Sequence, residues 1–179
     1  TAIEKPDALD VLAVDSNPKA VLALKQKIQK EKLRKISAVQ SDLFENVFGK
    51  FNVIIFNPPY LPEDKGITDS ALYGGKKGWE LSERFFHLVS RYLAHDGIIL
   101  FLFSSLTNKA KIDGIIQSNL LQFKELERQK MPFFEELYVY EITKTPLLRT
   151  LESKGLEDIH YFAQGKRGKV FIGIFDRSK

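Results

Sequence analysis

The chain has 179 residues, 44% of them hydrophobic and 28% charged, which is enough for one globular domain with a proper core. Its net charge of +4 permits an acidic or nucleic-acid partner without requiring one, and the lack of cysteine excludes disulfides and thiolate metal sites. The three histidines are scattered, so we expect no metal site. No apolar run approaches the ~20 residues that span a bilayer, and the first residues do not resemble a signal peptide, so we expect a soluble cytoplasmic protein without membrane contact.

The first predicted strand covers residues 9–15 and ends in an acid, Asp15. In a Rossmann-like sheet an acid at this place hydrogen-bonds a ribose diol, about 20 residues after a glycine-rich loop. No such loop occurs in this sequence, and residues 1–8 resemble the end of an earlier element. The stretch from Asp15 to Pro18 is also typical of a helix N-cap, with Ser16 or Asn17 as the capping residue. Both roles are compatible.

A helix is predicted after Pro18, with an apolar face formed by Ala20, Val21, Leu24 and Ile28. Its other face is rich in lysine, which we interpret as solvated, with nucleic-acid contact as the less favoured alternative. Residues 36–40 form the next predicted strand. Their modest, alternating hydrophobicity is typical of a sheet edge, which could take a partner strand.

The strand predicted at residues 51–56 has the β-branched and aromatic residues of a strand that is buried on both faces. Asn57-Pro58-Pro59-Tyr60 follows at once. Proline has no N–H, fixes its own φ and restrains the residue before it, so the strand ends here in a stiff, extended turn. In open α/β sheets, ligands bind at this carboxyl end of the strands.

This tetrapeptide indicates methyl transfer to a planar –NH2 group, whose delocalised lone pair makes the nitrogen a poor nucleophile. The Asn57 side-chain oxygen and the Pro58 carbonyl can accept both N–H donors, which orients the group and stabilises the positive charge that develops on nitrogen. Pro58 and Pro59 fix the carbonyl dipoles in advance, and Tyr60 can lie against the flat substrate group. A plain strand-ending turn is the alternative interpretation, because Asn-Pro is a common turn pair.

The remaining chain continues the alternation of helices and strands. Residues 61–73 are predicted to form a polar loop that closes over substrate, and glycines at 74, 75 and 78 supply backbone freedom beside it. Trp79 either faces the substrate or packs against the protein. A helix is predicted next, with core residues Leu81, Phe85, Leu88, Val89 and Tyr92. It is followed by a turn at 95–97, a strand at 98–103 that is expected to be buried on both faces, a helix at 108–119, and a strand pair at 123–129 and 137–143. The C-terminal extension at 145–179 is predicted to contain a helix and two strands, which a turn at 165–169 joins.

The tetrapeptide after an apolar strand resembles motif IV of class I S-adenosylmethionine-dependent methyltransferases that modify amide or exocyclic nitrogens. Residues 71–80 with their three glycines, residues 83–86 and residues 133–137 resemble the HemK-related branch of archaea and eukaryotes. That branch methylates the glutamine of the Gly-Gly-Gln loop in class-1 peptide-chain release factors. The resemblance covers roughly residues 9–144, and the glycine element is its more discriminating part.

The resemblance implies an α/β fold with a Rossmann-like class I methyltransferase sheet, mostly parallel with a C-terminal antiparallel hairpin. Its first strand and Gly-x-Gly-x-Gly loop are missing here and are expected before Thr1. Residues 1–144 would then be an N-terminally incomplete methyltransferase domain, and residues 145–179 an extension packed on the same domain.

The resemblance also implies the site and its partners. The expected catalytic residues are Asn57, Pro58, Pro59 and Tyr60, and the expected S-adenosylmethionine contacts are Asp15 at the ribose, Ser16, Asp42 and Leu43 at the adenine, and Asn57. For Asp42, a loop acid that caps a turn is the alternative. A release factor is the expected substrate, nucleic acid is not required, and a small zinc-ribbon activator is expected to cover the edge of strand 36–40. The alternatives are an N6-adenine or other amino-group methyltransferase acting on DNA or RNA, and an inactive binding subunit.

Overall fold

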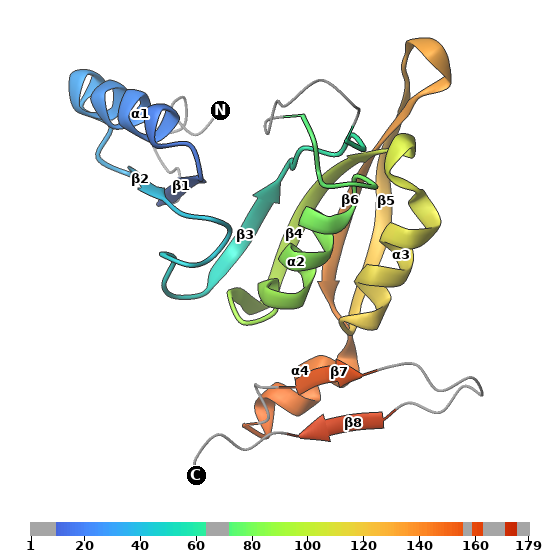
Figure 1. The fold of residues 1–179 in the computed structure, drawn as a ribbon. Helices are drawn as coiled ribbons and strands as arrows, with labels where there is room; N and C mark the ends of the chain where they lie inside the picture. Colours follow the sequence, from blue (N-terminus) through green and yellow to red (C-terminus); the bar gives the residue numbers. More distant parts are fainter. Residues whose placement is uncertain (1–9, 64–71, 156–158, 163–170, 175–179) are drawn as a thin grey trace. The chain divides into compact units, whose positions relative to one another are not determined.

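The computed structural model describes residues 10–63, 72–155, 159–162 and 171–174 (Figure 1). Residues 1–8, most of the predicted substrate loop (64–71) and the predicted turn at 165–169 lie outside these ranges. The chain divides into two compact units, Thr1–Gly49 and Lys50–Lys179. None of the helices in the described ranges is long and apolar enough to cross a membrane.

The first unit is a strand–helix–strand element. Strands β1 (Val11–Asp15) and β2 (Ile36–Gln40) pair in parallel, from Val11 opposite Ile36 to Asp15 opposite Gln40. A parallel pair needs a crossover connection, which helix α1 (Pro18–Glu31) supplies. The Asn17 side chain caps this helix by accepting the backbone N–H of Lys19 at 2.9 Å. The predicted strands, helix and cap are therefore confirmed.

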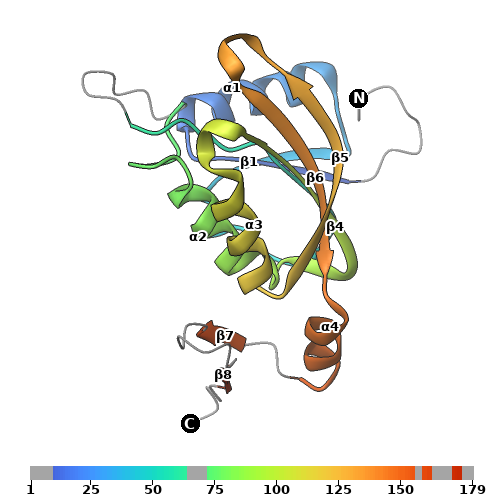
Figure 2. The same ribbon diagram turned by 90° about the vertical axis from the view of Figure 1, so that its right-hand side faces the viewer.

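The second unit contains a four-stranded sheet in the order β3-β4-β6-β5. Strand β3 (Phe51–Phe56) pairs in parallel with β4 (Leu93–Ser104), whereas β6 (Glu136–Lys144) is antiparallel to both β4 and β5 (Leu121–Lys130). Helices α2 (Glu80–Val89) and α3 (Lys109–Ser118) lie against the same face of this sheet (Figure 2). The predicted antiparallel hairpin at the end of the sheet is thus confirmed.

The core under α2 and α3 is largely aromatic. Phe85 on α2 stacks on Phe56 with ring centroids 3.9 Å apart, and Phe86 meets Phe101 edge-on at 5.0 Å. Phe103 extends this cluster along β4 and meets Tyr140 of β6 at 4.9 Å. Such ring pairs add about 0.5–1.5 kcal/mol each to the stabilisation from burial. Phe86 is fully buried although it was not among the predicted core residues, whereas Phe85 and Val89 were.

Two strands are less buried than predicted. On β3, the end strand of the described four-stranded sheet, Val53 is 42% and Ile55 is 76% exposed, because the aromatic partner in α2 packs on the opposite face. On β4, Ile99, Phe101 and Phe103 are fully buried, whereas the residues between them are only half-buried. The expectation that both strands are buried on both faces is therefore wrong for this unit, because α2 and α3 cover one face.

The predicted turn at residues 95–97 lies inside the span of β4. Phe51 pairs with Leu93 and Val53 with Ile98, so β4 uses extra residues between these two pairs and bulges there. At this same end of the sheet, β6 leads directly into α4 (Pro146–Ser153), which the Thr145 hydroxyl caps by accepting the N–H of Leu148.

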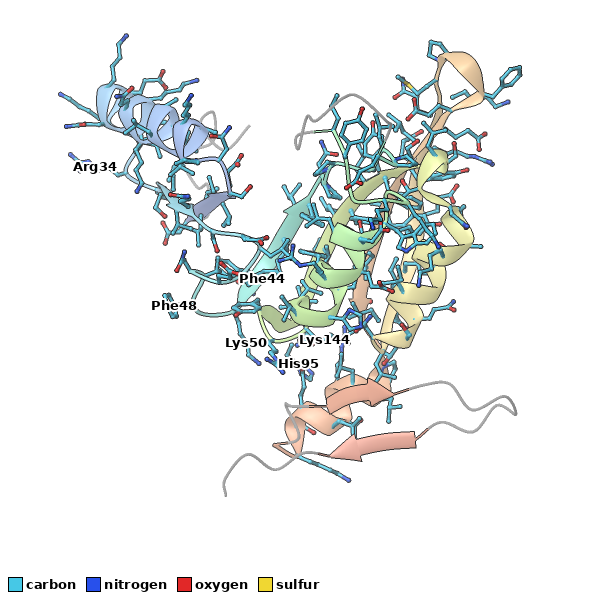
Figure 3. All side chains as sticks on the ribbon, viewed as in Figure 1. Arg34, Phe44, Phe48, Lys50, His95 and Lys144 are labelled. Atoms are coloured by element: carbon cyan, nitrogen blue, oxygen red, sulfur yellow. The ribbon has the colours of Figure 1, made fainter. Side chains whose placement is uncertain are left out.

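A buried lysine joins α4 to the sheet. Lys144, labelled in Figure 3, is fully buried and donates from Nζ to the Leu93 carbonyl at 2.8 Å and to Glu152 Oε1 at 2.6 Å. Beyond α4, strands β7 (Ile159–Phe162) and β8 (Phe171–Ile174) form a separate antiparallel pair.

Candidate active site

Asp15 and Asp42 follow neighbouring parallel strands of the first unit. Asp15 ends β1, and the Ser41 N–H donates to its carbonyl at 3.0 Å, which brings the start of the 41–47 loop to the same edge. The Asp15 side chain is exposed, and its Oδ1 accepts the N–H of Asn17 at 2.8 Å. Its Oδ2 makes no hydrogen bond within the described part of the chain, so it is available to a ligand hydroxyl.

Leu43, the second predicted adenine contact, has a left-handed backbone with φ of 49°. A leucine adopts this conformation only where the surrounding structure holds it, and such strain concentrates at ligand-binding sites. The loop around it is held by the Asn46 N–H, which donates to Ser41 Oγ at 2.9 Å, and by burial of Phe44 and Val47. Ser16 is exposed, and its carbonyl accepts from the Gln40 side chain at 3.4 Å.

The second unit carries the Asn57–Tyr60 motif at the carboxyl end of β3, as the sequence predicts. Pro58 is buried, Pro59 and Tyr60 are half-buried, and Asn57 is exposed. The Asn57 amide makes no hydrogen bond with any residue in the described ranges. Its oxygen is thus not consumed by neighbouring backbone, which is the condition that recognition of an –NH2 group requires.

A glycine turn packs directly against the backbone of this motif. A β-carbon on Gly74 would stand 2.5 Å from the Pro59 carbonyl oxygen, and one on Gly78 would stand 2.5 Å from the Tyr60 carbonyl oxygen. Hydrogen bonds from Gly74 N to Leu61 O and from Glu63 N to Gly75 O join the two segments. The glycines therefore permit a close approach that fixes the motif, in addition to the freedom expected of them.

The Tyr60 carbonyl is also held from the side of β4. Thr107 lies in the short helix η1 (Ser105–Thr107) that follows β4, and its buried hydroxyl donates to Tyr60 O at 3.3 Å. Thr107 was not among the residues predicted from the sequence. The available signal was its place among polar residues directly after a buried strand, where ligand-binding edges occur.

A carboxylate lies within electrostatic reach of the motif. Ser104 at the end of β4 donates to Glu135 Oε1 at 2.6 Å. Burial raises the pKa of the Tyr60 phenol, and the negative charge of Glu135 raises it further. Tyr60 therefore stays protonated at neutral pH and can present a neutral ring to a substrate amide.

Several other polar groups take structural roles. The Trp79 ring lies under two ammonium groups, those of Lys77 at 5.3 Å and Lys111 at 5.8 Å, which favours the packing interpretation of this residue. His87 bonds through its ring to the Glu83 carbonyl, one turn earlier on α2. Among the described residues, no three acidic or histidine side chains gather in a way that could hold a metal ion.

The comparisons with known proteins decide the family. Residues 1–131 match the family described as Methyltransferase small domain. The chain belongs to this family.

The methyltransferase chain also has named relatives. It is 41% identical over 143 residues to a Methanocaldococcus jannaschii protein provisionally named a protein N5-glutamine methyltransferase, covering 77% of this chain and 72% of that protein. It is 36% identical over 110 residues to the release factor glutamine methyltransferase of Aquifex aeolicus, covering 54% of this chain and 38% of that protein.

A solved structure shares the fold of the methyltransferase chain. The E. cuniculi Mtq2–Trm112 complex, described as responsible for methylation of the eRF1 translation termination factor, matches with a TM-score of 0.53 at 19% identity. The match covers 80% of this chain and 91% of that one. The predicted methyltransferase family, enzyme class and α/β fold class are thus confirmed. The roles of the individual site residues and the domain boundary at 144 stay predictions.

Proposed function

We propose that this methyltransferase uses S-adenosylmethionine to methylate the N5 nitrogen of a glutamine side chain in the Gly-Gly-Gln loop of a peptide-chain release factor. The observation that carries the proposal is the exposed amide of Asn57, which bonds to no residue in the described part of the chain and lies beside the rigid Pro58–Pro59 backbone at the carboxyl end of β3. The names of the M. jannaschii and A. aeolicus relatives support glutamine as the acceptor, and the similarity to E. cuniculi Mtq2, which is described as acting on eRF1, supports a termination factor.

The motif acts by orienting the acceptor amide. Asn57 Oδ1 and the Pro58 carbonyl accept the two N–H donors, so the nitrogen is held in one plane and its positive charge is stabilised as it develops. The Tyr60 ring packs on the flat amide, and Pro59 keeps the turn extended. The substrate nitrogen would bond to the methyl carbon as the bond from that carbon to the sulfonium sulfur breaks and leaves a neutral thioether. The methylated nitrogen would then release its proton to water, so no strong base is needed at the start.

S-adenosylmethionine, when bound, supplies an electrophilic methyl group on a sulfonium. The residues fit this cofactor, because Asp15 keeps one carboxylate oxygen for the ribose hydroxyls and Leu43 holds a constrained backbone at the neighbouring strand end. We infer that Ser16 lines the ribose side, that Asp42 accepts from the adenine amino group, and that Asn57 also contacts the cofactor.

We further propose that a small zinc-ribbon activator pairs with the enzyme along β2. In the described chain β2 has one strand neighbour, β1, so its other edge can take a partner strand. The E. cuniculi Mtq2 was solved with Trm112, which supports a two-protein assembly.

The test measures methyl transfer from labelled S-adenosylmethionine to purified release factor by the full-length enzyme, with and without the activator. Asn57→Ala is expected to lower kcat by about 10²–10³-fold, the cost of losing one oriented polar group in such a site. Asn52→Ala changes the same residue type at an exposed position of β3, the strand that precedes the motif, and is the matched control, expected within about twofold of wild type. Methylation of a release factor whose acceptor glutamine is alanine, or of RNA or DNA but not protein, would overturn the proposal.

A further inference from the structure

The turn between β5 and β6 lies at the same edge of the sheet as the Asn57–Tyr60 motif. Phe56 of β3 pairs in parallel with Phe101 of β4, so Asn57 leaves the sheet at the carboxyl end of β4. Leu137 of β6 lies opposite Ser104, the last residue of β4, so the turn that precedes β6 extends past this end (Figure 1). This turn, residues Met131–Glu135, includes the short helix η2 (Pro132–Phe134).

Three hydrogen bonds fix Glu135 at this edge. Its carbonyl accepts the Met131 N–H at 2.8 Å, its Oε1 accepts the Ser104 hydroxyl at 2.6 Å, and the next N–H donates to Ser105 Oγ at 3.0 Å. Ser104 is fully buried, so the carboxylate is anchored to the sheet and not to a mobile surface group. The other oxygen, Oε2, makes no hydrogen bond within the described residues, although a carboxylate oxygen is a strong acceptor.

The residue before Glu135 is constrained and fully exposed. Phe134 has a left-handed backbone with φ of 63°, which aromatic residues rarely adopt. Its side chain is 103% exposed. The turn thus presents a large aromatic ring to solvent beside an anchored carboxylate, and the strained backbone is the feature that distinguishes it from an ordinary exposed hydrophobic residue.

We propose that the Met131–Glu135 turn is a second contact surface for the polypeptide substrate, next to the site that holds the acceptor glutamine; this rests on the proposed function. Glu135 Oε2 accepts a backbone N–H of the substrate loop, and the Phe134 ring packs on the same stretch of backbone. A glycine-rich loop suits this contact because its N–H groups have no side chains to shield them. A nucleic acid does not, because its phosphates would be repelled by the carboxylate.

Steady-state kinetics of the full-length enzyme with release factor as the varied substrate test the proposal. In Glu135→Gln the Ser104 bond can be kept and the charge is lost, so the KM for release factor is expected to rise about tenfold. Phe134→Ala is expected to raise it about fivefold. In both variants kcat and the KM for S-adenosylmethionine should stay within about twofold of wild type.

Matched controls come from the neighbouring strand β5. Glu125→Gln and Leu126→Ala change exposed residues of the same chemical types and should leave every constant within about twofold of wild type. A KM for release factor in Glu135→Gln that equals that of Glu125→Gln overturns the inference alone. The inference is also overturned if Glu135→Gln lowers kcat, cofactor binding and thermal stability at once, because that pattern marks a structural role. If wild type does not methylate release factor at all, the proposed function itself fails.

Discussion

Gly78 approaches Tyr60 so closely that a β-carbon on the glycine would stand 2.5 Å from the tyrosine carbonyl oxygen. The same carbonyl accepts a hydrogen bond from the Thr107 hydroxyl at 3.3 Å, so the last residue of the motif is held between the glycine turn and helix η1, which follows β4. Both contacts act on the backbone of the motif, and neither acts on the side chains that would touch the substrate. The geometry of the Asn57 and Pro58 acceptors therefore depends on residues that make no substrate contact.

Gly78→Ala is accordingly expected to lower kcat at least tenfold, because a displacement of about 1 Å in an orienting group has large kinetic effects. The added methyl group must displace backbone, and Gly78 also has a φ of 87° that alanine tolerates poorly. The measurement is kcat for release factor, together with calorimetric binding of S-adenosylmethionine to show that the cofactor site persists.

Gly114→Ala is the matched control for this variant. Gly114 lies in the middle of α3, and a β-carbon there would meet nothing within 4 Å. Alanine should therefore stabilise the helix by about 0.5–1 kcal/mol and leave kcat unchanged. Equal kcat values for Gly78→Ala and Gly114→Ala would show that the close approach to Tyr60 does not position the motif.

The buried lysine between the sheet and α4 allows a stability prediction. Glu152→Gln removes the negative charge that lies 2.6 Å from Lys144 Nζ and leaves a fully buried ammonium group with neutral acceptors in place of a carboxylate. We expect a loss of about 3–5 kcal/mol in the free energy of unfolding, measured by urea denaturation. The double variant Lys144→Met with Glu152→Leu should recover at least half of this loss, because no buried charge remains.

The ion pair between Arg149 and Asp96 is the control for this prediction. Its closest atoms are 3.5 Å apart and the Asp96 side chain is 80% exposed. Asp96→Asn should change the free energy of unfolding by less than about 1 kcal/mol. A Glu152→Gln effect as small as that of Asp96→Asn would mean that water or a rearranged side chain compensates the Lys144 charge.

Local patterns in the sequence predicted the elements well. The strands at 36–40 and 51–56 have the bounds that the structure gives them, because an uninterrupted apolar or alternating run ends at polar residues or at the Pro58–Pro59 pair. Asn17 was one of two predicted caps for the same reason: a short polar side chain precedes a proline at the first helical position.

Contacts between distant segments could not be predicted. Thr107 and Tyr60 are 47 residues apart, and Ser104 and Glu135 are 31 apart, so no local pattern marks these pairs. Hydrophobicity showed that β3 is apolar, but it carries no information on which face α2 covers, and the exposed Ile55 follows from that arrangement. A lysine is expected to be exposed from sequence alone, and Lys144 is buried only because α4 brings an acid to it.

The pKa of the Tyr60 phenol depends on the negative charge of Glu135. Burial and the Glu135 charge both raise the pKa of Tyr60 above its ordinary value, so removal of the charge in Glu135→Gln should lower this pKa while burial keeps it raised. The titration can be followed by NMR with tyrosine labelled at Cζ, and the resonance is assigned by its absence in Tyr60→Phe. An unchanged Tyr60 titration in Glu135→Gln would place the carboxylate out of reach of the motif.

The raised pKa of Tyr140 should make the stability of the second unit depend on alkaline pH. Its hydroxyl donates to Asp113 Oδ1 at 3.0 Å. Burial raises the pKa of Tyr140 from 10.0 to about 12; the hydrogen bond with Lys109 lowers this pKa, and the one with Asp113 raises it further. In the unfolded chain the phenol loses its proton near its ordinary value, whereas the folded chain keeps it. The stabilisation that the protonated phenol gives the folded chain is therefore complete below pH 10 and is lost as the pH rises to about 12.

Tyr140→Phe should cost about 1 kcal/mol at pH 8 and should flatten the fall in unfolding free energy between pH 10 and 12, as measured by urea denaturation at each pH. Parallel stability curves for wild type and Tyr140→Phe over this range would mean that another group governs the alkaline transition.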